Sequence, residues 1–299
     1  MRSPVSRLPS IAAKPLLVIV GETASGKSQL AIELAKRFNG EIICADSRTV
    51  YKGMDVSTAK PSDSDKRRVP HYMIDVVEPN EPFTVADFKH RSEKAINDIQ
   101  KKGKLPIMVG GSGLYVDAIL YDFEFRQAPN QTLRNRLNAL SVDELQAEVI
   151  SNNLPMPRNQ NNARHLIRVI ETGGQQPNSK PLRPNTLVLA LKVDREVLKK
   201  RITERVDRMV DEGLSEEIKK VSDKYGWHHK ALRTPAYIAF KKFIENEINL
   251  EQAKNEFIQN DMQLAKRQRT WFKRNPSIQW LDDPLNAVDF VTTFLSKKQ

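Results

Sequence analysis

The chain has 299 residues, a length that suggests about two domains, and 48 Lys and Arg against 37 Asp and Glu give a net charge of +11. This excess favours a polyanionic partner without choosing between nucleic acid, anionic lipid and phosphorylated metabolites. No apolar run approaches the length of a membrane helix, and a single cysteine excludes a disulfide framework. Residues 1–14 lack the apolar core of a secretory signal. We therefore expect a cytoplasmic protein with no membrane association.

Apolar runs and helical periodicity alternate in the N-terminal part. Residues 15–20 form a compact apolar run that predicts a strand, and residues 21–28 form a glycine-bearing loop. An amphipathic stretch that predicts a helix follows this loop. Residues 41–45 and 105–109 have the composition of further buried strands, and 85–100 have helical periodicity. Strands that alternate with helices predict a parallel sheet that is covered on both faces.

The character of the sequence changes between residues 122 and 183. Asn and Gln abound from 127 to 176 while Phe, Trp and Tyr are absent, and basic residues outnumber acidic ones eight to four from Arg126 to Arg183. Residues 187–193 then predict a returning core strand, followed by helices through Lys273 and a last strand near Ile278–Leu281. We therefore predict a core at 1–121 and 184–299, with an inserted small helical domain at 122–183.

Residues 21–28 match the phosphate-loop pattern G-x-x-x-x-G-K-[ST]. In such a loop, backbone N–H groups point at phosphate oxygens, Lys27 adds a positive charge, and Ser28 is a ligand for Mg²⁺. The pattern predicts a P-loop NTPase-like α/β fold, in which the whole loop binds phosphate: Gly21, Glu22, Thr23, Ala24, Ser25, Gly26, Lys27 and Ser28. Because ATP or GTP is the usual ligand of such loops, a small-molecule kinase is the default alternative.

Two polar segments follow the predicted strands. Asp46 comes directly after the strand 41–45, and the glycine-rich turn 110–113 follows the strand 105–109. Because ligands gather at the carboxyl ends of parallel strands, both segments should lie beside the phosphate loop. At this point a helix cap and a carboxylate that orders Mg²⁺ are both open interpretations of Asp46.

These segments together resemble the tRNA dimethylallyltransferases, also called tRNA isopentenyltransferases, over residues 15–281. The resemblance rests on Gly-x-Thr-Ala-Ser-Gly-Lys-Ser at 21–28, Ala-Asp-Ser at 45–47, Val-Tyr-Lys-Gly-Met-Asp at 50–55, Ser-Thr-Ala-Lys-Pro at 57–61, Pro-His at 70–71, Ala-Asp-Phe at 86–88, Gly-Lys-Leu-Pro at 103–106, Val-Gly-Gly-Ser-Gly-Leu-Tyr at 109–115, Asn161, Asn162, Ile167, Arg168, Glu171, Arg201, Arg205, Met209, Gly213, Leu214, and Leu-Ala-Lys-Arg-Gln at 264–268 with Thr270 and Trp271. Thr-Ala-Lys-Pro and Ala-Lys-Arg-Gln-x-Thr-Trp are not generic features of phosphate loops.

One departure concerns the phosphate loop itself. The usual proline after the first glycine is Glu22 in this chain. An acid at this position is expected to weaken pyrophosphate binding unless its side chain points toward Mg²⁺ or away from the ligand.

The resemblance implies transfer of a dimethylallyl group from dimethylallyl diphosphate to N6 of the adenine adjacent to the anticodon of tRNA, with release of pyrophosphate. Lys27, the loop N–H groups, Mg²⁺ held through Ser28, and Arg205 would stabilise the leaving pyrophosphate. Asp46 would accept the N6 proton as general base. Arg201 and Arg205 lie four residues apart on a predicted helix, so they either face the pocket together or pair with nearby acids on a solvated face.

The resemblance also implies a surface for the tRNA anticodon stem-loop, bound by a monomer. The residues expected to contact tRNA are Asp46, Ser47, Arg48, Thr49, Ser112, Arg134, Arg164, His165, Arg168, Lys266, Arg267, Gln268 and Lys273. Trp271 and Phe272 lie beside the last group, and for both we favour a place in the core.

Two alternatives besides the kinase remain open. An adenylate isopentenyltransferase would use the same donor with free AMP as acceptor, and a non-enzymatic RNA-binding protein would keep the phosphate loop as a relic. The basic insertion and residues 265–271 favour tRNA, because neither AMP nor a small metabolite has a phosphate backbone to contact.

Overall fold

The computed structural model describes residues 14–124, 130–175 and 180–296. Residues 1–13, in which no secretory signal is expected, therefore lie outside the described residues, as does Arg126, one of the basic residues of the insertion.

A parallel sheet of six strands, in the order β3-β2-β4-β1-β5-β6, forms the centre of the core. The strands are β1 (Leu16–Val20), β2 (Gly40–Cys44), β3 (His71–Tyr72), β4 (Leu105–Gly110), β5 (Thr186–Leu191) and β6 (Ile278–Leu281). In the middle, Leu17 lies between Ile107 and Leu187 in register. Every residue of β1, β2 and β4 is buried, as expected for strands with helices on both faces. The predicted parallel α/β sheet is confirmed.

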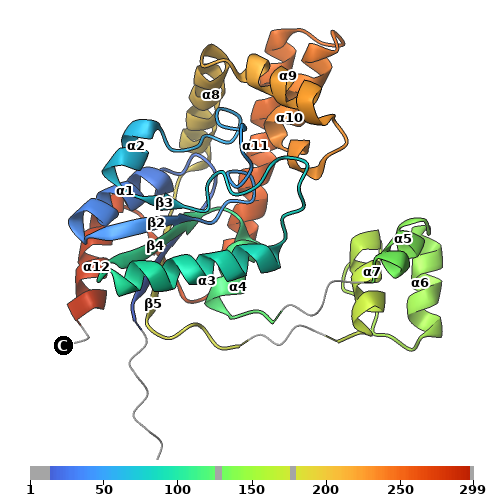
Figure 1. Ribbon diagram of the computed structural model, residues 1–299, viewed down its shortest axis with the longest axis horizontal. Coiled ribbons are helices and arrows are strands. Elements are labelled where there is room, and N and C mark those ends of the chain that lie inside the picture. The colour runs from blue at the N-terminus through green and yellow to red at the C-terminus, as the bar shows by residue number, and fades with distance from the viewer. Residues whose placement is uncertain (1–13, 125–129, 176–179, 297–299) are drawn as a thin grey trace, which may run out of the picture. The chain divides into compact units, whose positions relative to one another are not determined.

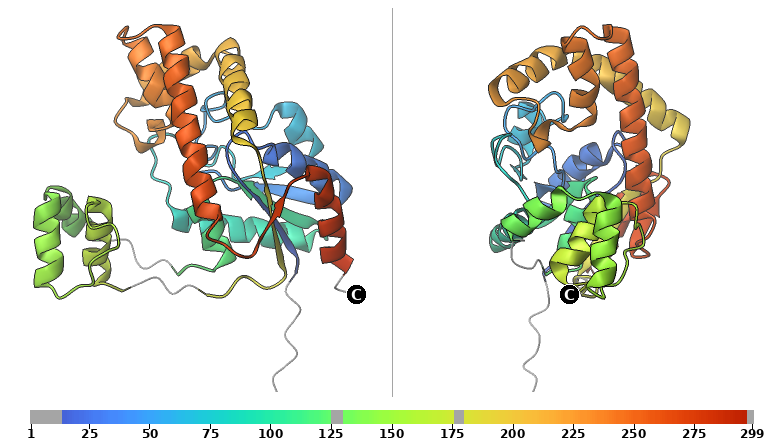
Figure 2. Two further views of the ribbon diagram at one scale, coloured as in Figure 1. Left: turned by 180° about the vertical axis from the view of Figure 1, so that it is seen from behind. Right: turned by 90° about the vertical axis from the view of Figure 1, so that its right-hand side faces the viewer.

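Helices cover both faces of this sheet (Figures 1 and 2). The crossover from β1 to β2 and the crossover from β3 to β4 run in opposite directions along the sheet, so right-handed connections place α1 and α3 on opposite faces. The helices are α1 (Lys27–Arg37), α2 (Asp63–Arg68), α3 (Val85–Lys101), α4 (Gly113–Leu120), α5 (Gln131–Asn138), α6 (Val142–Ser151), α7 (Ala163–Thr172), α8 (Arg195–Asp211), α9 (Leu214–Tyr225), α10 (Pro235–Ile244), α11 (Leu250–Phe272) and α12 (Ala287–Ser296).

Helices α8 to α11 pack together around an apolar cluster that also includes Val50, Tyr51 and Met54 from the segment after β2. Tyr237 and Phe240 of α10 are fully buried in it, and the Phe240 ring meets that of Phe257 on α11 edge to face at 6.2 Å. Figure 2 shows α11 running from this cluster down to the sheet. One stripe of α11 is therefore buried along the whole helix, and this stripe reaches the carboxyl ends of the strands.

The chain divides into two compact units, Met1–Leu120 with Leu182–Gln299, and Tyr121–Pro181. The second unit has a small core in which Leu137, Leu145 and Leu166 from α5, α6 and α7 are fully buried. Ser141 and Glu144 form a capping box that fixes the start of α6.

Most predicted elements of the core are present, with ends shifted by one or two residues. The sequence did not indicate β3, a strand of two residues, or the terminal helix α12. Among the described residues, no helix combines the length and the apolar character needed to cross a bilayer.

Candidate functional site

The phosphate loop joins β1 to α1 and is curled by residues with left-handed backbone. Gly26 has φ of 95° directly before Lys27, a conformation that disfavours any side chain. Inside the curl, the carbonyl oxygen of Glu22 accepts hydrogen bonds from Ser25 N at 3.3 Å and from Lys27 Nζ at 2.8 Å. The lysine ammonium is thus held against the loop that precedes it.

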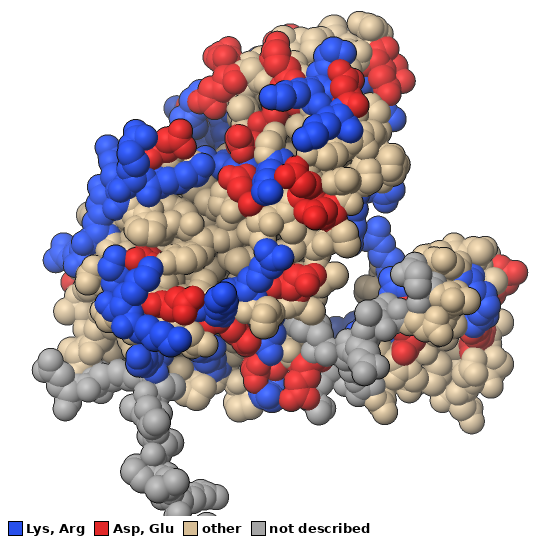
Figure 3. All heavy atoms as spheres, viewed as in Figure 1, with Lys and Arg blue, Asp and Glu red and all other residues tan. Residues whose placement is uncertain are grey.

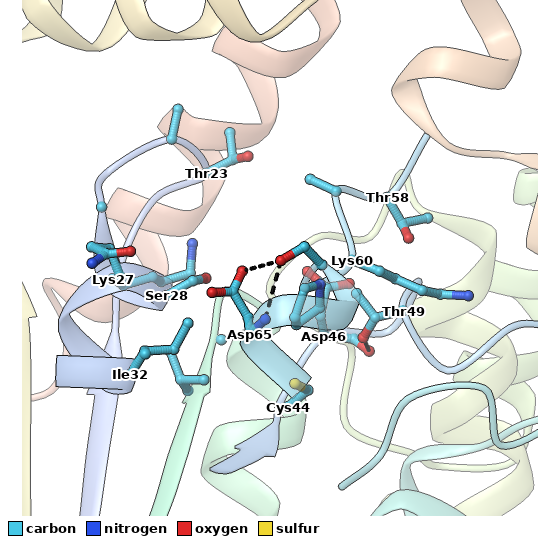
Figure 4. A pocket seen from close by; sticks show the side chains of 18 of the residues that line it. Thr23, Lys27, Ser28, Ile32, Cys44, Asp46, Thr49, Thr58, Lys60 and Asp65 are labelled. Carbon is cyan, nitrogen blue, oxygen red and sulfur yellow. Dashed lines mark hydrogen bonds between the residues drawn. The ribbon is translucent and has the colours of Figure 1, made fainter. Parts of the chain in front are cut away.

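The loop borders a cavity of about 610 Å³ at the carboxyl edge of the sheet. Figure 4 shows Lys27 and Ser28 on one side of this cavity, with Asp46 and Thr49, which follow β2, across from them. Arg205 from α8 also lines it. A cation-bearing phosphate loop, a carboxylate and an arginine therefore share one cavity, as the sequence predicted for Lys27, Asp46 and Arg205.

The electrostatics of the cavity centre on Lys27. Burial of its ammonium lowers the pKa of Lys27 to about 8; the nearby Arg205 lowers the pKa further, while Asp46 and Glu22 oppose the shift. Burial raises the pKa of the Cys44 thiol to about 12, so this cavity-lining cysteine stays protonated near neutral pH and is no nucleophile.

Two arginines of α8 contact the phosphate loop. Arg205 donates from one terminal nitrogen to Thr23 Oγ1 at 2.7 Å and from the other to the carboxylate of Asp261. Arg201 donates to the carbonyl oxygen of Ser25 at 3.2 Å. Arg205 Nε is buried and has no hydrogen-bond partner within the described chain. The two arginines thus face the loop rather than pairing with acids on a solvated face.

The second glycine-rich loop lies directly beside Asp46. Ser112 Oγ accepts a hydrogen bond from Ser47 N at 2.9 Å. The backbones come so close that a Cβ on Gly110 would lie 2.1 Å from the carbonyl oxygen of Ala45. A glycine is required there because the clash would be with backbone, which cannot turn away. Ser112 is thereby fixed next to the candidate base.

Two residues of α11 support the phosphate loop, a role that the sequence did not suggest. Gln268, predicted to contact tRNA, is buried, and its Oε1 accepts a hydrogen bond from Thr23 N at 2.7 Å. Arg269 pairs with the buried carboxylate of Glu22. The signal was available, since Phe257, Asp261, Ala265, Gln268 and Phe272 form one buried helical stripe, and polar residues in such a stripe need polar partners.

The prediction for the neighbouring aromatic residues is half right. Phe272 is buried, but placing Trp271 in the core was wrong, because this side chain is 37% exposed. Its Nε1 donates to Asp117 at 2.8 Å. The ring lies over Gly113, where a Cβ would come within 2.3 Å of it. Trp271, Gly113 and Ser112 border a shallow cavity of about 300 Å³.

Three of the predicted tRNA contacts lie on the exposed side of α11 or at its end. Lys266, Arg267 and Lys273 are exposed, and none has an ion-pair partner in the described part of the chain. Arg48 instead donates to the carbonyl oxygens of Lys230 at 3.2 Å and Arg233 at 3.4 Å. On the face drawn in Figure 3, basic and acidic side chains are intermixed, so net charge alone does not locate the RNA surface.

The remaining predicted contacts belong to the second unit. Arg164, His165 and Arg168 are exposed on α7. Arg134 makes a two-pronged ion pair with Glu171, whose side chain is 2% exposed. The Arg134 guanidinium therefore already has a structural partner. Arg168 also lies 3.7 Å from the Glu171 carboxylate, but its side chain is half exposed, like those of Arg164 and His165 that face solvent.

The chain is similar to known tRNA dimethylallyltransferases in sequence and in structure. A family model described as IPP transferase matches residues 49–275. The tRNA dimethylallyltransferase of Anoxybacillus flavithermus is 38% identical over 282 residues, covering 89% of this chain and 90% of that protein. The crystal structure of the tRNA isopentenylpyrophosphate transferase of Bacillus halodurans gives a TM-score of 0.75 at 32% identity, with 96% and 98% coverage. The crystal structure of a eukaryotic dimethylallyltransferase acting on tRNA gives a TM-score of 0.80 at 25% identity. The match covers 96% of this chain and 81% of that chain. The chain therefore belongs to the IPP transferase family, that of the tRNA dimethylallyltransferases.

Proposed function

We propose that this protein transfers a dimethylallyl group from dimethylallyl diphosphate to N6 of the adenine adjacent to the anticodon in tRNA. The observation that carries the proposal is the shared cavity in which Asp46 lies across from Lys27 and Ser28. A phosphate loop on one wall suits a diphosphate leaving group, and a carboxylate on the other suits removal of a proton from an amine.

In the proposed reaction, the bond between the allylic carbon and the pyrophosphate oxygen breaks as the bond from adenine N6 to that carbon forms. Lys27, the loop N–H groups and Arg205 stabilise the negative charge that grows on the pyrophosphate. Asp46 takes the N6 proton, which leaves the prenylated amine neutral. Arg205 lines the cavity while its terminal nitrogens bind Thr23 and Asp261, so it would act on the pyrophosphate mainly through its positive charge.

The donor set in the cavity fits Mg²⁺. Mg²⁺ prefers oxygen ligands and is usually held by one or two protein groups together with substrate phosphates. The Ser28 hydroxyl supplies such an oxygen on the phosphate-loop side of the cavity, and the described residues contain no preformed cluster of three acidic, His or Cys ligands. When bound, the metal would add positive charge beside the departing pyrophosphate.

The target base has to leave the anticodon loop to reach Asp46, as enzymes that modify base edges generally require. We propose that Lys266, Arg267 and Lys273 contact the phosphates of the stem-loop, and that the insertion at 122–183 is a tRNA-binding domain that uses Arg164, His165 and Arg168. Ser47 and Ser112 lie where they would contact nucleotides beside the target base.

We also propose that the protein acts as a monomer in the cytoplasm. One chain supplies the phosphate loop, the carboxylate and the arginine of the cavity. Its cysteine is a free, buried thiol, which suits a reducing compartment.

A single assay tests the proposal against its alternatives. Labelled dimethylallyl diphosphate and Mg²⁺ are incubated with total tRNA, with an anticodon stem-loop or with AMP, and ATP consumption is followed separately. Label is expected in tRNA and in the stem-loop; preferential labelling of AMP, or phosphoryl transfer from ATP without labelling, would refute the proposal.

Asp46→Asn should lower turnover about 10²- to 10⁴-fold while tRNA binding stays near normal. If binding collapses and turnover per complex survives, Asp46 positions RNA instead.

A further inference from the structure

The acid that departs from the family motif does not face the donor cavity. Glu22 is only 4% exposed, and it borders a second cavity of about 650 Å³ beyond the loop together with Arg269, Val193 and Asp194. Its carboxylate pairs with Arg269 through Nε and through a terminal nitrogen at 3.0 Å, and that nitrogen also donates to Val193 O at 2.9 Å. The carboxylate is thus held by an arginine that is itself fixed to the end of the central sheet.

The backbone carbonyl of Glu22 positions the ammonium of Lys27. Lys27 Nζ donates to the carbonyl oxygen of Glu22 at 2.8 Å, and Ser25 N donates to that oxygen as well. The next residue, Thr23, is held through its N–H by Gln268. A shift of Glu22 would therefore move the group that positions the Lys27 ammonium.

We propose that Glu22 and Arg269 form a positioning pair that shapes the phosphate loop and cancels the charge of the acid beside the pyrophosphate site. The inference rests on the proposed function, since the loop is taken to bind a diphosphate. It explains why this chain tolerates an acid where its family has proline. The residue that compensates is Arg269, which stands at the x position of the Ala-Lys-Arg-Gln-x-Thr-Trp motif.

If Glu22 and Arg269 form such a pair, removing either charge alone should have unequal effects on donor affinity. Removing Arg269 leaves a buried carboxylate without a partner next to a site for an anion, and that charge repels the donor. Removing only the charge of Glu22 leaves Arg269 bonded to Val193, and the extra positive charge does not repel the donor. Removing both charges restores neutrality, so the double variant should bind the donor better than the variant that lacks Arg269 alone.

The experiment measures the affinity for dimethylallyl diphosphate with Mg²⁺ by calorimetry, together with KM and kcat, in four variants and the unaltered chain. Arg269→Gln should raise Kd and KM for the donor by at least about tenfold. Glu22→Gln should stay within about threefold, and Glu22→Gln/Arg269→Gln should recover most of the loss. Arg274→Gln is the matched control, because it removes one exposed positive charge just beyond α11 and should leave donor binding unchanged.

Thermal unfolding of each variant separates positioning from loss of the fold. If Arg269→Gln does not fold, the double variant, which buries no unpaired charge, is still expected to fold and to bind the donor. A double variant that binds no better than Arg269→Gln, or a Glu22→Gln variant as weak as Arg269→Gln, would overturn the pair while the proposed function stands. Absence of donor binding by the unaltered chain would overturn both.

Discussion

Raising the pH from 7 to 9 should weaken the use of the prenyl donor, because it removes the proton from Lys27. Burial lowers the pKa of this lysine to about 8, so its ammonium is charged below that pH and neutral above it. With this pKa, about nine tenths of the protein carries the charge at pH 7 and about one tenth at pH 9. Only the charged form attracts pyrophosphate, so kcat/KM for dimethylallyl diphosphate should fall roughly tenfold over this range.

The assay varies the donor at saturating anticodon stem-loop and fixed ionic strength, from pH 6.5 to 9.5. The pH profile of kcat/KM reports the enzyme before the donor binds, whereas the profile of kcat reports the complex. Bound pyrophosphate stabilises the ammonium, so the descending limb of kcat should lie at higher pH than that of kcat/KM. This separation follows from a group that contacts the donor and would not follow from general loss of structure at high pH.

The control is Lys27→Arg, which keeps its charge throughout the range. This variant is expected to be slower, because the guanidinium is larger, but its kcat/KM should not fall between pH 7 and 9. A profile of the natural chain that stays flat to pH 9.5, or an unchanged descending limb in Lys27→Arg, would refute the assignment of the limb to Lys27.

Three further perturbations test separate parts of the site. The double variant Arg267→Gln/Lys273→Gln should reduce the slope of log tRNA affinity against log salt concentration by about 1–2 units, while donor affinity stays unchanged. An unaltered slope would show that neither residue belongs to the RNA surface. Asp261→Asn should lower turnover roughly 10- to 100-fold, because Arg205 loses the carboxylate that orients it; turnover within about threefold of normal would contradict this. Gly110→Ala should lower the melting temperature by several degrees, roughly 1–3 kcal/mol of strain, and an unchanged melting curve would show that the strand ends can separate.

The central sheet was predictable because its strands are buried on both faces. Strands of this kind have mainly apolar residues in the sequence, and β1, β2 and β4 each correspond to such an apolar run. By contrast, β3 comprises only His71 and Tyr72 and forms because the edge of β2 offers Ile42 and Ile43 for pairing. A two-residue strand has no periodicity of its own, so its existence depends on a neighbour that is distant in sequence.

The site was predictable where local sequence fixes geometry. The spacing of Gly26, Lys27 and Ser28 specifies a phosphate loop, and a carboxylate after the next strand must lie at the same edge of the sheet. The partners of the loop were not predictable in this way, because Thr23 meets Gln268 across 245 residues of sequence. Which face of α11 turns inward is decided by its packing on α10 and on the loop, and not by the motif itself.

Helix α11 ties the two halves of the proposed reaction together. Its buried stripe holds the donor loop through Gln268 and, one residue on, Arg269 pairs with Glu22, while its exposed side presents Arg267 and Lys273. Because a helix of 23 residues is rigid between adjacent positions, these two surfaces cannot shift independently. The insertion is a separate compact unit, so the affinity for tRNA that we propose for it could change without moving the phosphate loop. In the proposed reaction, α11 would therefore hold the geometry that has to be precise within fractions of an ångström. The insertion would supply the part of the binding strength that can vary among tRNAs.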